Sequence, residues 1–429
     1  MQKILLFIAS LFYFNFLFSK NEIKSWQGIH ETPLSRLEQQ FAEPPVEFAN
    51  HVIWGWEGKM DKKTICNDLD SIKKKGFRAV IFEAGYKLPF KYLSEEWFKA
   101  IRTGVVEAKK RDMKVWIIDE GKYPSGFAGG KFSQERPDLR MQALVIGDTI
   151  QIKRGEVMTN HKIAPEIISA VAVSTSGAPN RTVEINNGKI SFNAGLDDWK
   201  ILLVKSDFRT AVTRAVNNPN GGKDATNSLC DYLNPVAVQQ FIDWTHKQYK
   251  KYLGKELGTT VLGFRGDEPD YAHLPWTPSI VQTFKDTKGY DPTPYLASFF
   301  TASPTIQEQR VKADYWDVWS SLFATHFFKL QADWCAANGV AHITHLNKEH
   351  EMPACVKAEG DYFRALSKVQ IPGVDAIWNQ IWPSTLNDFP KLASSVAHVY
   401  GKPRAFSESF AAYHISPTIP QAKFVVDHQ

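Results

Sequence analysis

Three acidic residues follow an apolar segment in the middle of the sequence. Residues 259–264 read TTVLGF, and Asp267, Glu268 and Asp270 come soon afterwards, around a proline. In proteins built from parallel strands, substrates bind at the carboxyl ends of the strands. The stretch therefore predicts a buried strand whose end presents carboxylates for chemistry.

Other apolar runs also end in an acid, a histidine or a tryptophan. Along the chain these residues are Trp54 and Trp56, Glu83, Asp119 and Glu120, His345, Asp375 and Trp378, and Glu408. Acids combined with aromatic side chains are the equipment of glycoside hydrolysis, in which one acid protonates the leaving oxygen and another carboxylate activates water or attacks the sugar. We therefore expect a carbohydrate site where these runs end.

A structural role competes with catalysis for each acid. Aspartate is a good N-cap, so Asp119 or Asp267 alone could serve to start the next helix. Glutamate caps poorly, which makes Glu268 and Glu408 the catalytic candidates. Trp54 and Trp56 share one strand face, so at least one of them is expected to pack in the core. The predicted substrate-binding residues are Trp56, Asp119, Glu120, Tyr123, Asp267, His345, Asp375 and Trp378.

Two motifs suggest a metal or a phosphate at first sight. In HITHLNKEHE, residues 342–351, His342 and His345 point to opposite faces of a strand, and there is no HExxH pattern. A catalytic transition metal is therefore not expected, and the metal ligands stay open. In PSGFAGGKF, residues 124–132, the glycine spacing differs from a phosphate loop and no Ser or Thr follows the lysine. We interpret this segment as a tight structural turn.

Strand-like runs alternate with helical patterns over most of the chain. Residues 46–56, 77–85 and 113–121 read as strands, separated by helical patterns that include residues 95–110. A helix over 235–253, a strand at 259–264 and helical stretches follow, with further strands at 339–346, 371–377 and 403–410. This gives seven β/α units. Residues 141–213 interrupt the alternation with strand-like runs only, which predicts an inserted antiparallel β subdomain.

The alternation predicts an α/β fold of the (β/α)₈ TIM-type barrel, incomplete with about seven β/α units. The expected organisation is a signal peptide at 1–20, an N-terminal segment at 21–45, a first barrel part at 46–140, the β-rich insertion at 141–230, and a second barrel part at 231–429 that ends before the eighth strand. A doubly wound open sheet is the alternative, but the glycine-rich turn expected after its first strand is absent.

Composition and the N-terminus limit the cellular setting. Hydrophobic residues at 43% and charged residues at 23% are ordinary for a globular protein, and no basic run suggests nucleic acid. Lys3 followed by an apolar stretch at 4–18 resembles a secretory signal, which predicts a periplasmic or secreted protein without stable membrane insertion after cleavage. An uncleaved anchor is the alternative. The four cysteines lack metal-finger spacing and are expected to be free thiols.

Five motifs together resemble a known family. They are HVIWGWEGKM, IIDEGKYPSGFAGG, DYLNPVAVQQFIDWTHKQY, GFRGDEPDY and SSVAHVYGKPRAFSESF. Together they resemble glycoside hydrolase family 106, the bacterial α-L-rhamnosidases and their relatives, from about residue 50 onwards. The resemblance implies a (β/α)₈ catalytic domain and hydrolysis of terminal α-L-rhamnosides with inversion. It places the general acid on Glu268 and the general base on Glu408. It also implies calcium near the active site, although the chemistry itself needs no cofactor.

Two function classes remain open at this point. The first is an exported inverting glycosidase that acts on the carbohydrate of a polysaccharide or glycoconjugate. The second is a vestigial barrel that binds carbohydrate without turnover, or a fragment of a full-length glycosidase with another sugar specificity. The presence of both Glu268 and Glu408 favours an enzyme, because a binding module has no need for a matched acid and base. The oligomeric state is left open.

Overall fold

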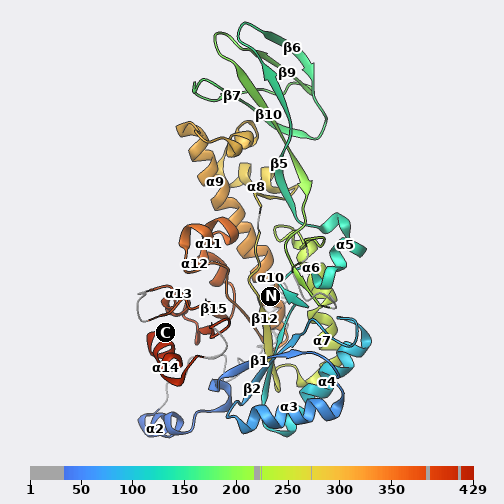
Figure 1. Ribbon diagram of the computed structural model, residues 1–429, viewed down its shortest axis with the longest axis vertical. Helices are drawn as coiled ribbons and strands as arrows, with labels where there is room; N and C mark the ends of the chain where they lie inside the picture. The colour runs from blue at the N-terminus through green and yellow to red at the C-terminus, as the bar shows by residue number, and fades with distance from the viewer. Residues whose placement is uncertain (1–32, 217–222, 224, 272, 383–386, 414–416) are drawn as a thin grey trace, which may run out of the picture.

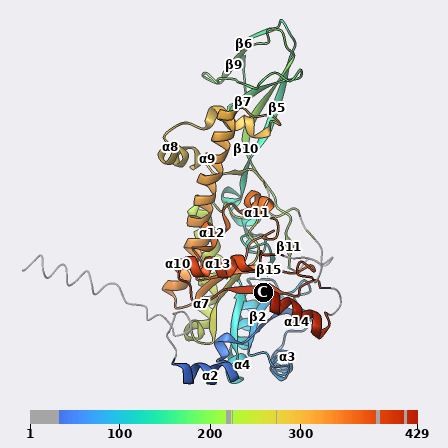
Figure 2. The ribbon, with the colours of Figure 1, turned by 90° about the vertical axis from the view of Figure 1, so that its left-hand side faces the viewer.

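The structure is a computed structural model that describes residues 33–216, 223, 225–271, 273–382, 387–413 and 417–429. A parallel sheet with its helices forms one part of the molecule, and an antiparallel β region projects from it (Figures 1 and 2). The predicted signal peptide at 1–20 lies outside the described residues. Among the residues that are described, no helix is both long and apolar enough to cross a membrane.

Seven strands form one curled parallel sheet. In sheet order they are β1 (His51–Trp56), β2 (Ala79–Ala84), β3 (Lys114–Ile118), β12 (Val261–Gly266), β14 (Ala341–Thr344), β15 (Ile371–Ala376) and β16 (Phe406–Ser409). Every neighbouring pair is parallel, and the order in space follows the order along the chain. The alternating β/α pattern read from the sequence is therefore confirmed as a barrel-like parallel sheet.

Helices connect and cover these strands. They are α2 (Leu34–Ala42), α3 (Lys62–Lys74), α4 (Glu95–Lys110), α5 (Lys131–Glu135), α6 (Pro235–Trp244), α7 (His246–Leu253), α8 (Ile280–Lys288), α9 (Ile306–Leu322), α10 (Lys329–Ala337), α11 (Met352–Glu359), α12 (Tyr362–Leu366), α13 (Lys391–Val399) and α14 (Ile419–His428). Polar side chains start several of them: Asp61 accepts the Thr64 N–H of α3, and Ser94 accepts the Trp97 N–H of α4.

The prediction of a single helix over residues 235–253 is wrong in one respect. The backbone of Thr245 is non-helical, with φ −111° and ψ −88°, so α6 ends at Trp244 and α7 starts at His246. The Thr245 hydroxyl donates to the Phe241 carbonyl at 2.7 Å. Such a side-chain bond to the carbonyl four residues back is a local alternative to the helix ladder. The break gives α7 its own direction, with His246 at its first position.

The parallel sheet has two buried faces, because side chains alternate along a strand. The helix-facing side includes Val80, Phe82 and Ile117, packed against residues of α3, α4 and α7. The opposite, inner face is a separate apolar layer. Its buried members are Ile81, Trp116, Ile118, Leu262, Ala341, Ile343 and Ile371, with Phe406 packed against them.

The insertion is antiparallel, as predicted. Its strands are β5 (Gln142–Ile152), β6 (Val157–Lys162), β7 (Ile167–Ser174), β8 (Arg181–Thr182), β9 (Lys189–Asn193) and β10 (Trp199–Phe208). A five-stranded sheet has the order β13-β5-β10-β7-β8, where β13 (Pro275–Trp276) comes from the segment after β12. At the base of the insertion, β11 (Arg214–Ala215) pairs with β4 (Lys122–Tyr123). The insertion is therefore attached to the segments that follow β3 and β12.

A long helical rod connects the two regions. Helix α9, a π-helical segment at Phe323–Phe328 and helix α10 follow one another without a break. Figures 1 and 2 both show the rod running from the antiparallel region towards the parallel sheet. Helix α9 starts with a capping box in which Thr305 and Glu308 satisfy each other's backbone N–H groups. The rod ends beside β14, at the cysteine Cys335 and the turn that follows.

Candidate active site

Charged residues gather at the carboxyl ends of the strands on the inner face. His345 comes two positions after the inner-face residue Ile343, and Glu408 comes two positions after Phe406. Side chains two positions apart on a strand point the same way, so both are directed to the inner face. The register of β15 and β16 sets Asp375 beside Glu408. The sheet therefore brings together residues that are far apart in the sequence.

Arg265 is a buried cation in this group. Its side chain is 2% exposed, and its Nη2 contacts Glu408 Oε2. The same nitrogen lies 2.8 Å from His345 Nε2 and 3.7 Å from Asp267 Oδ1. A buried charge is costly unless it is paired, and these carboxylates provide the pairing. Arg265 therefore links β12 to β16 and gives Glu408 a fixed counter-charge.

His345 shares the same carboxylates. It is 1% exposed, and its Nε2 lies 3.3 Å from Glu408 Oε2 and 3.4 Å from Asp267 Oδ1. Burial alone would lower the pKa of His345, but the charge of Asp375 and the contacts with Asp267 and Glu408 raise that pKa well above its ordinary value. The acids thus favour the charged imidazole, while the Arg265 cation, whose Nη2 lies 2.8 Å from Nε2, opposes it.

Glu268 and Asp375 form a second group around His345. One oxygen of each carboxyl lies within 4.8 Å of a ring nitrogen of His345 and of the other carboxyl. Burial raises the pKa of Glu268 and Asp267 adds to the rise, although His345, Asp375 and Tyr123 oppose it. Burial also raises the pKa of Asp375, to about 9. The two carboxyls titrate as a pair, and we expect them to retain a proton at neutral pH.

The surroundings of Glu408 shift its pKa in the opposite direction to that of Glu268. Burial alone would raise the pKa of Glu408, but Arg265 and His345 lower it to about 2. Its side chain is 18% exposed, so water can reach it. The pKa values of Glu268 and Glu408, which flank the same imidazole, are thus displaced in opposite directions. Such a displacement separates a proton donor from a proton acceptor.

The glycine-rich loop binds a carboxylate of the same protein, that of Glu120. The buried carboxylate of Glu120 accepts four backbone N–H groups at 2.5 to 2.9 Å, from Gly121, Phe127, Ala128 and Gly129. Positive φ values at Gly126 and Gly129 allow the loop to turn its amides inward. The predicted structural turn is confirmed. The structure also corrects the prediction that Glu120 binds substrate, since both of its oxygens already have partners.

Asp119 is likewise buried away from ligand. Its side chain is 0% exposed, and its Oδ1 accepts the Ser125 hydroxyl at 2.6 Å. The Ser125 oxygen in turn accepts the Asp267 N–H at 2.7 Å. Asp119 therefore positions the turn that carries Asp267 and Glu268, which corrects its predicted role as a substrate contact.

Trp56 lies in the core instead of the site. It is 0% exposed, and its ring packs against those of Phe82 and Trp97 on the helix-facing side of the sheet. Trp54, two positions earlier, shares this face, as the alternation of side chains requires. The prediction that Trp56 contacts substrate is corrected, and the expectation that one of the pair packs in the core applies to both.

Tyr123 and Trp378 stay candidates for sugar contact. The half-buried Tyr123 side chain interacts with Glu268, and its hydroxyl accepts Asn347 Nδ2 at 3.2 Å. Trp378 follows β15 and is 63% exposed, with its backbone N–H bonded to the Ala411 carbonyl at 3.0 Å. Both residues therefore leave aromatic surface near the strand ends that carry the acids.

The residues around His345 do not fit calcium. Calcium takes six to eight oxygen ligands. Asp267 and Glu408 share the cations Arg265 and His345, which would repel another cation at the same oxygens. Glu268 and Asp375 add only two carboxyls, again beside the charged imidazole. The described residues of this group therefore provide protons and charges, but no calcium shell.

Arg265 is the functional residue that the sequence analysis missed. It is part of LGFRGDEP, two positions before Asp267, in a run that was otherwise interpreted as a buried strand. A charged residue inside such a run needs an anionic partner. This signal was available in the sequence. It could have indicated an ion pair at the site, but not that the partner would be Glu408, 143 positions later.

Comparisons with known proteins agree with this arrangement. The sequence profile of a family described as alpha-L-rhamnosidase matches residues 152–423, which is more than half of the chain. A curated protein of Formosa agariphila, provisionally named a beta-glucuronidase, is 23% identical over an alignment of 433 positions that spans 88% of this chain and 35% of that protein. The chain thus spans about a third of that relative's length.

A solved structure shares the fold. The rhamnosidase of Novosphingobium sp. PP1Y superimposes with a TM-score of 0.64 over 89% of this chain and 53% of that chain, at 15% sequence identity. At this identity the likeness supports a common fold, and the chain spans about half of that protein's length. Together with the profile match, it confirms the resemblance drawn from the motifs: the chain belongs to glycoside hydrolase family 106, the α-L-rhamnosidase family.

Proposed function

We propose that the chain hydrolyses terminal α-L-rhamnosides of a polysaccharide or glycoconjugate with inversion of the anomeric centre. The observation that carries the proposal is the opposite electrostatic setting of Glu268 and Glu408 around His345. Burial raises the pKa of Glu268, while Arg265 and His345 lower the pKa of Glu408 to about 2. We therefore assign proton donation to Glu268, whose pKa is raised, and proton acceptance to Glu408, whose pKa is lowered.

The two carboxyls divide the chemistry between them. Glu268 donates its proton to the glycosidic oxygen as the bond from that oxygen to the anomeric carbon breaks. Glu408 takes a proton from a water whose oxygen attacks the anomeric carbon from the opposite face. Because Arg265 and His345 both contact Oε2 of Glu408, Oε1 is the oxygen we assign to the water. Proton exchange with solvent then restores both carboxyls.

The charges of the site favour a neutral sugar. Arg265 and His345 are already paired with carboxylates, and Lys122 lies 3.0 Å from Glu83. These three cations are therefore already neutralised, and an acidic sugar would gain little from them. One basic residue offers an alternative: Arg214 lies over the ring of Tyr123, 5.2 Å from its centroid, where a uronate carboxylate could pair with it. A glucuronide is therefore the appropriate competing substrate.

Two further proposals concern the protein around the site. We propose that the seven-stranded sheet belongs to a (β/α)₈ barrel, because the parallel order is continuous and the Novosphingobium rhamnosidase shares the fold. We also propose that the protein is exported, on the basis of Lys3 and the apolar stretch at 4–18. Neither proposal affects the assignment of acid and base.

Glutamine variants of the two glutamates test the mechanism with two rhamnosides. Glu268→Gln should lose about 10²–10⁴-fold in turnover of an alkyl rhamnoside, whose leaving group needs a proton, and much less with an activated aryl rhamnoside. Glu408→Gln should slow both substrates alike, since water must attack in either case. The exposed Glu166→Gln is the matched control and should keep full activity.

The product and the geometry give independent checks. Proton NMR of the first-formed sugar should show the inverted anomer, and a ligand complex should place the carboxyl groups of Glu268 and Glu408 about 6.5 to 9.5 Å apart. Retention would refute inversion in favour of a covalent glycosyl-enzyme intermediate, whereas small and equal losses in both variants would refute the assignment in favour of a binding barrel. Faster cleavage of an aryl glucuronide than of the rhamnoside would refute the sugar specificity alone.

A further inference from the structure

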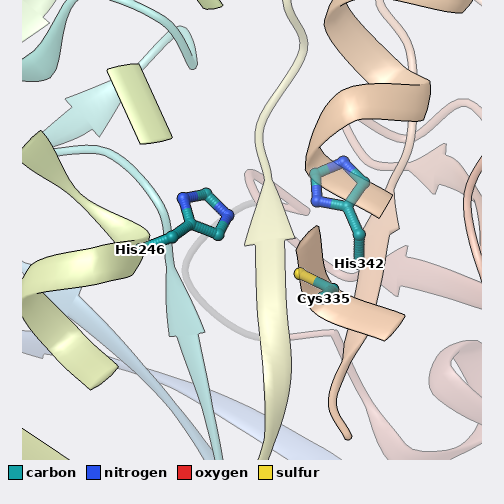
Figure 3. Close-up of side chains that lie close together, drawn as sticks. All are labelled: His246, Cys335 and His342. Carbon is teal, nitrogen blue, oxygen red and sulfur yellow. The ribbon is translucent and has the colours of Figure 1, made fainter. Parts of the chain in front are cut away.

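A second cluster of reactive side chains lies on the other face of the parallel sheet. Its members are His246 at the start of α7, Cys335 near the end of α10 and His342 in β14 (Figure 3). All three are buried, with exposures of 0%, 0% and 1%. One donor atom of each, an imidazole nitrogen or the thiol sulfur, lies within 4.8 Å of the other two. None of them belongs to the group around His345.

Alternation along β14 separates this cluster from the candidate active site. His345 points to the inner face, where it contacts Asp267 and Glu408, whereas His342 meets residues of α7 and α10. The sequence analysis expected these two histidines to face opposite ways, and the structure confirms it. What the sequence could not reveal is that His342 meets two further donors from distant elements.

The histidine nitrogens of the cluster lack partners. Within the described part of the chain, no hydrogen bond is formed by either ring nitrogen of His342 or by the Nε2 of His246. Leaving buried polar atoms unpaired is costly, and such atoms in a folded protein call for an explanation, such as an ion. Three unpaired nitrogens beside one buried thiol are therefore unusual for a core that only packs.

Thr245 fixes the state of the His246 ring. The Thr245 hydroxyl gives its hydrogen to the Phe241 carbonyl at 2.7 Å, so at 2.9 Å from His246 Nδ1 it can only accept. Nδ1 therefore carries the proton, and the lone pair is on Nε2, the atom without a partner. Histidines that bind metals are oriented in this way, with the other ring nitrogen donating to an oxygen.

We propose that His246, Cys335 and His342 bind a structural zinc ion that ties α7, α10 and β14 together. Nitrogen and sulfur are the donors that zinc prefers, and calcium or magnesium would need oxygens. Tetrahedral zinc, with bonds of about 2.0 to 2.3 Å, separates its ligand atoms by about 3.3 to 3.8 Å. The three donors lie within 4.8 Å of one another, so small side-chain rotations would close the site.

The surroundings suit a buried ion. Gln331, one turn before Cys335 on the same face of α10, has a buried Oε1 without a hydrogen-bond partner and is the candidate fourth ligand. The Cys335 thiol releases its proton to solvent when zinc binds. The tilted ring of Phe264 and the edge-on ring of Trp334 pack against His246, with ring centroids at 4.3 and 5.3 Å, and keep water away.

Metal titration of the intact chain tests the site. After treatment with a chelator, the wild-type protein should take up one equivalent of zinc, measured by elemental mass spectrometry, and melt at a higher temperature with zinc than without it. Cobalt(II) in place of zinc should give the absorption of a tetrahedral thiolate complex. A metal other than zinc bound at this site in the protein as purified from cells would overturn the choice of metal.

Variants separate binding from folding. Cys335→Ala and His342→Phe should lose stoichiometric zinc binding, whereas Cys355→Ala, an equally buried cysteine in α11, should keep it. Thr245→Val leaves all three ligands in place, and should weaken zinc affinity by about 10–100-fold because the His246 ring loses its orienting partner. Circular dichroism checks that each variant is folded. No zinc uptake by the wild type, or equal uptake by Cys335→Ala, would overturn the proposal.

Discussion

At the scale of single residues, Arg265 decides how the acids of the site behave. It contacts Glu408 and lies 3.7 Å from Asp267, from a position that is only 2% exposed. Without a counter-charge, burial would raise the pKa of Glu408 and favour the protonated form of this proposed base. The same carboxylate is ionised only because a guanidinium and an imidazole face one of its oxygens. The base therefore depends on a residue that takes no part in proton transfer.

Replacing Arg265 should shift the pH dependence of the reaction. Because the pKa of Glu408 is lowered mainly by Arg265, Arg265→Met should raise that pKa, and with it the pH below which the base is protonated and activity is lost. We expect the acidic limb of the kcat/KM profile to move up by about 1–3 pH units, the usual effect of one close opposite charge. The basic limb, which reports the protonated acid, should move much less.

Arg265→Lys is the matched control for charge. It keeps a cation at the same position, so its acidic limb should stay close to that of the wild type even if turnover falls. If Arg265→Met reduced activity equally at every pH, Arg265 would have a purely structural role, and the electrostatic account of Glu408 would be wrong.

The candidate catalytic residues could be predicted from the sequence, but the contacts around them could not. Glu268 and Glu408 could be identified because glutamate is a poor cap and both follow strand-like runs. Whether an acid at a strand end faces ligand or protein was not visible. Glu120 and Asp119 follow β3 as expected, yet the folded loop bonds both oxygens of Glu120, and Ser125 bonds Oδ1 of the fully buried Asp119. Such contacts depend on how the loop closes, which no local pattern encodes.

At the scale of elements, one strand can serve two sites. β14 presents His342 to the helices, and His345 follows the same strand on the inner face. The strands themselves were predictable from short apolar runs with regular spacing. The break between α6 and α7 was not, because Thr245 leaves the helix through a hydrogen bond to Phe241 that any threonine could form. The position of His246, and hence the second cluster, follows from that break.

The insertion has a core of its own and should unfold without the parallel sheet. Trp199 in β10 is 3% exposed and packs with Phe192 and other buried residues that all lie between 152 and 203. Trp199→Ala should destabilise this region by about 3–5 kcal/mol, the usual effect of emptying a buried aromatic site. Hydrogen exchange measured by mass spectrometry should then speed up in peptides from 142–208 and stay unchanged in peptides from the seven parallel strands.

Lys200→Ala is the control within the same strand. Lys200 is exposed, so its loss should leave exchange in β10 and its neighbours as in the wild type. Faster exchange across both regions in Trp199→Ala would mean that the insertion and the sheet unfold as one unit.

At the scale of the whole molecule, several acids are buried in a form that keeps its proton. Burial raises the pKa of Asp375 to about 9 and that of Glu349 to about 8. Two histidines show the opposite shift: burial lowers the pKa of the fully buried His342 to about 3 and that of the half-buried His51 to about 4. These groups link folding to pH in separate ranges, because the histidines titrate below pH 7 in both folded and unfolded chains.

The free energy of unfolding should therefore fall between pH 7 and pH 9. In this range the unfolded chain has lost its carboxyl protons, while folded Glu349 keeps its proton up to about pH 8 and folded Asp375 up to about pH 9, so each rise in pH favours unfolding. One such group changes the free energy by about 1.4 kcal/mol per pH unit until its folded pKa is passed. Urea unfolding at a series of pH values measures the slope.

Glu349→Gln should flatten this slope, because the amide cannot lose a proton yet can still accept the Leu346 N–H. Glu166→Gln, at an exposed position of the insertion, should leave the slope as it is in the wild type. A stability that rises from pH 7 to pH 9 would contradict the buried, protonated state of these acids.

The inner face of the parallel sheet also limits how a polymer can be handled. Trp116, Ile118 and Ile343, with their neighbours, fill the space beneath the charged residues at the strand ends. A saccharide chain cannot be threaded through this packed layer of the parallel sheet. Under the proposed function, substrate would arrive at the strand-end side, and the released sugar would depart by that side before the next chain end enters. Entry and exit by the same side favour an enzyme that removes one sugar residue at a time from chain ends. They disfavour an enzyme that slides along a polymer.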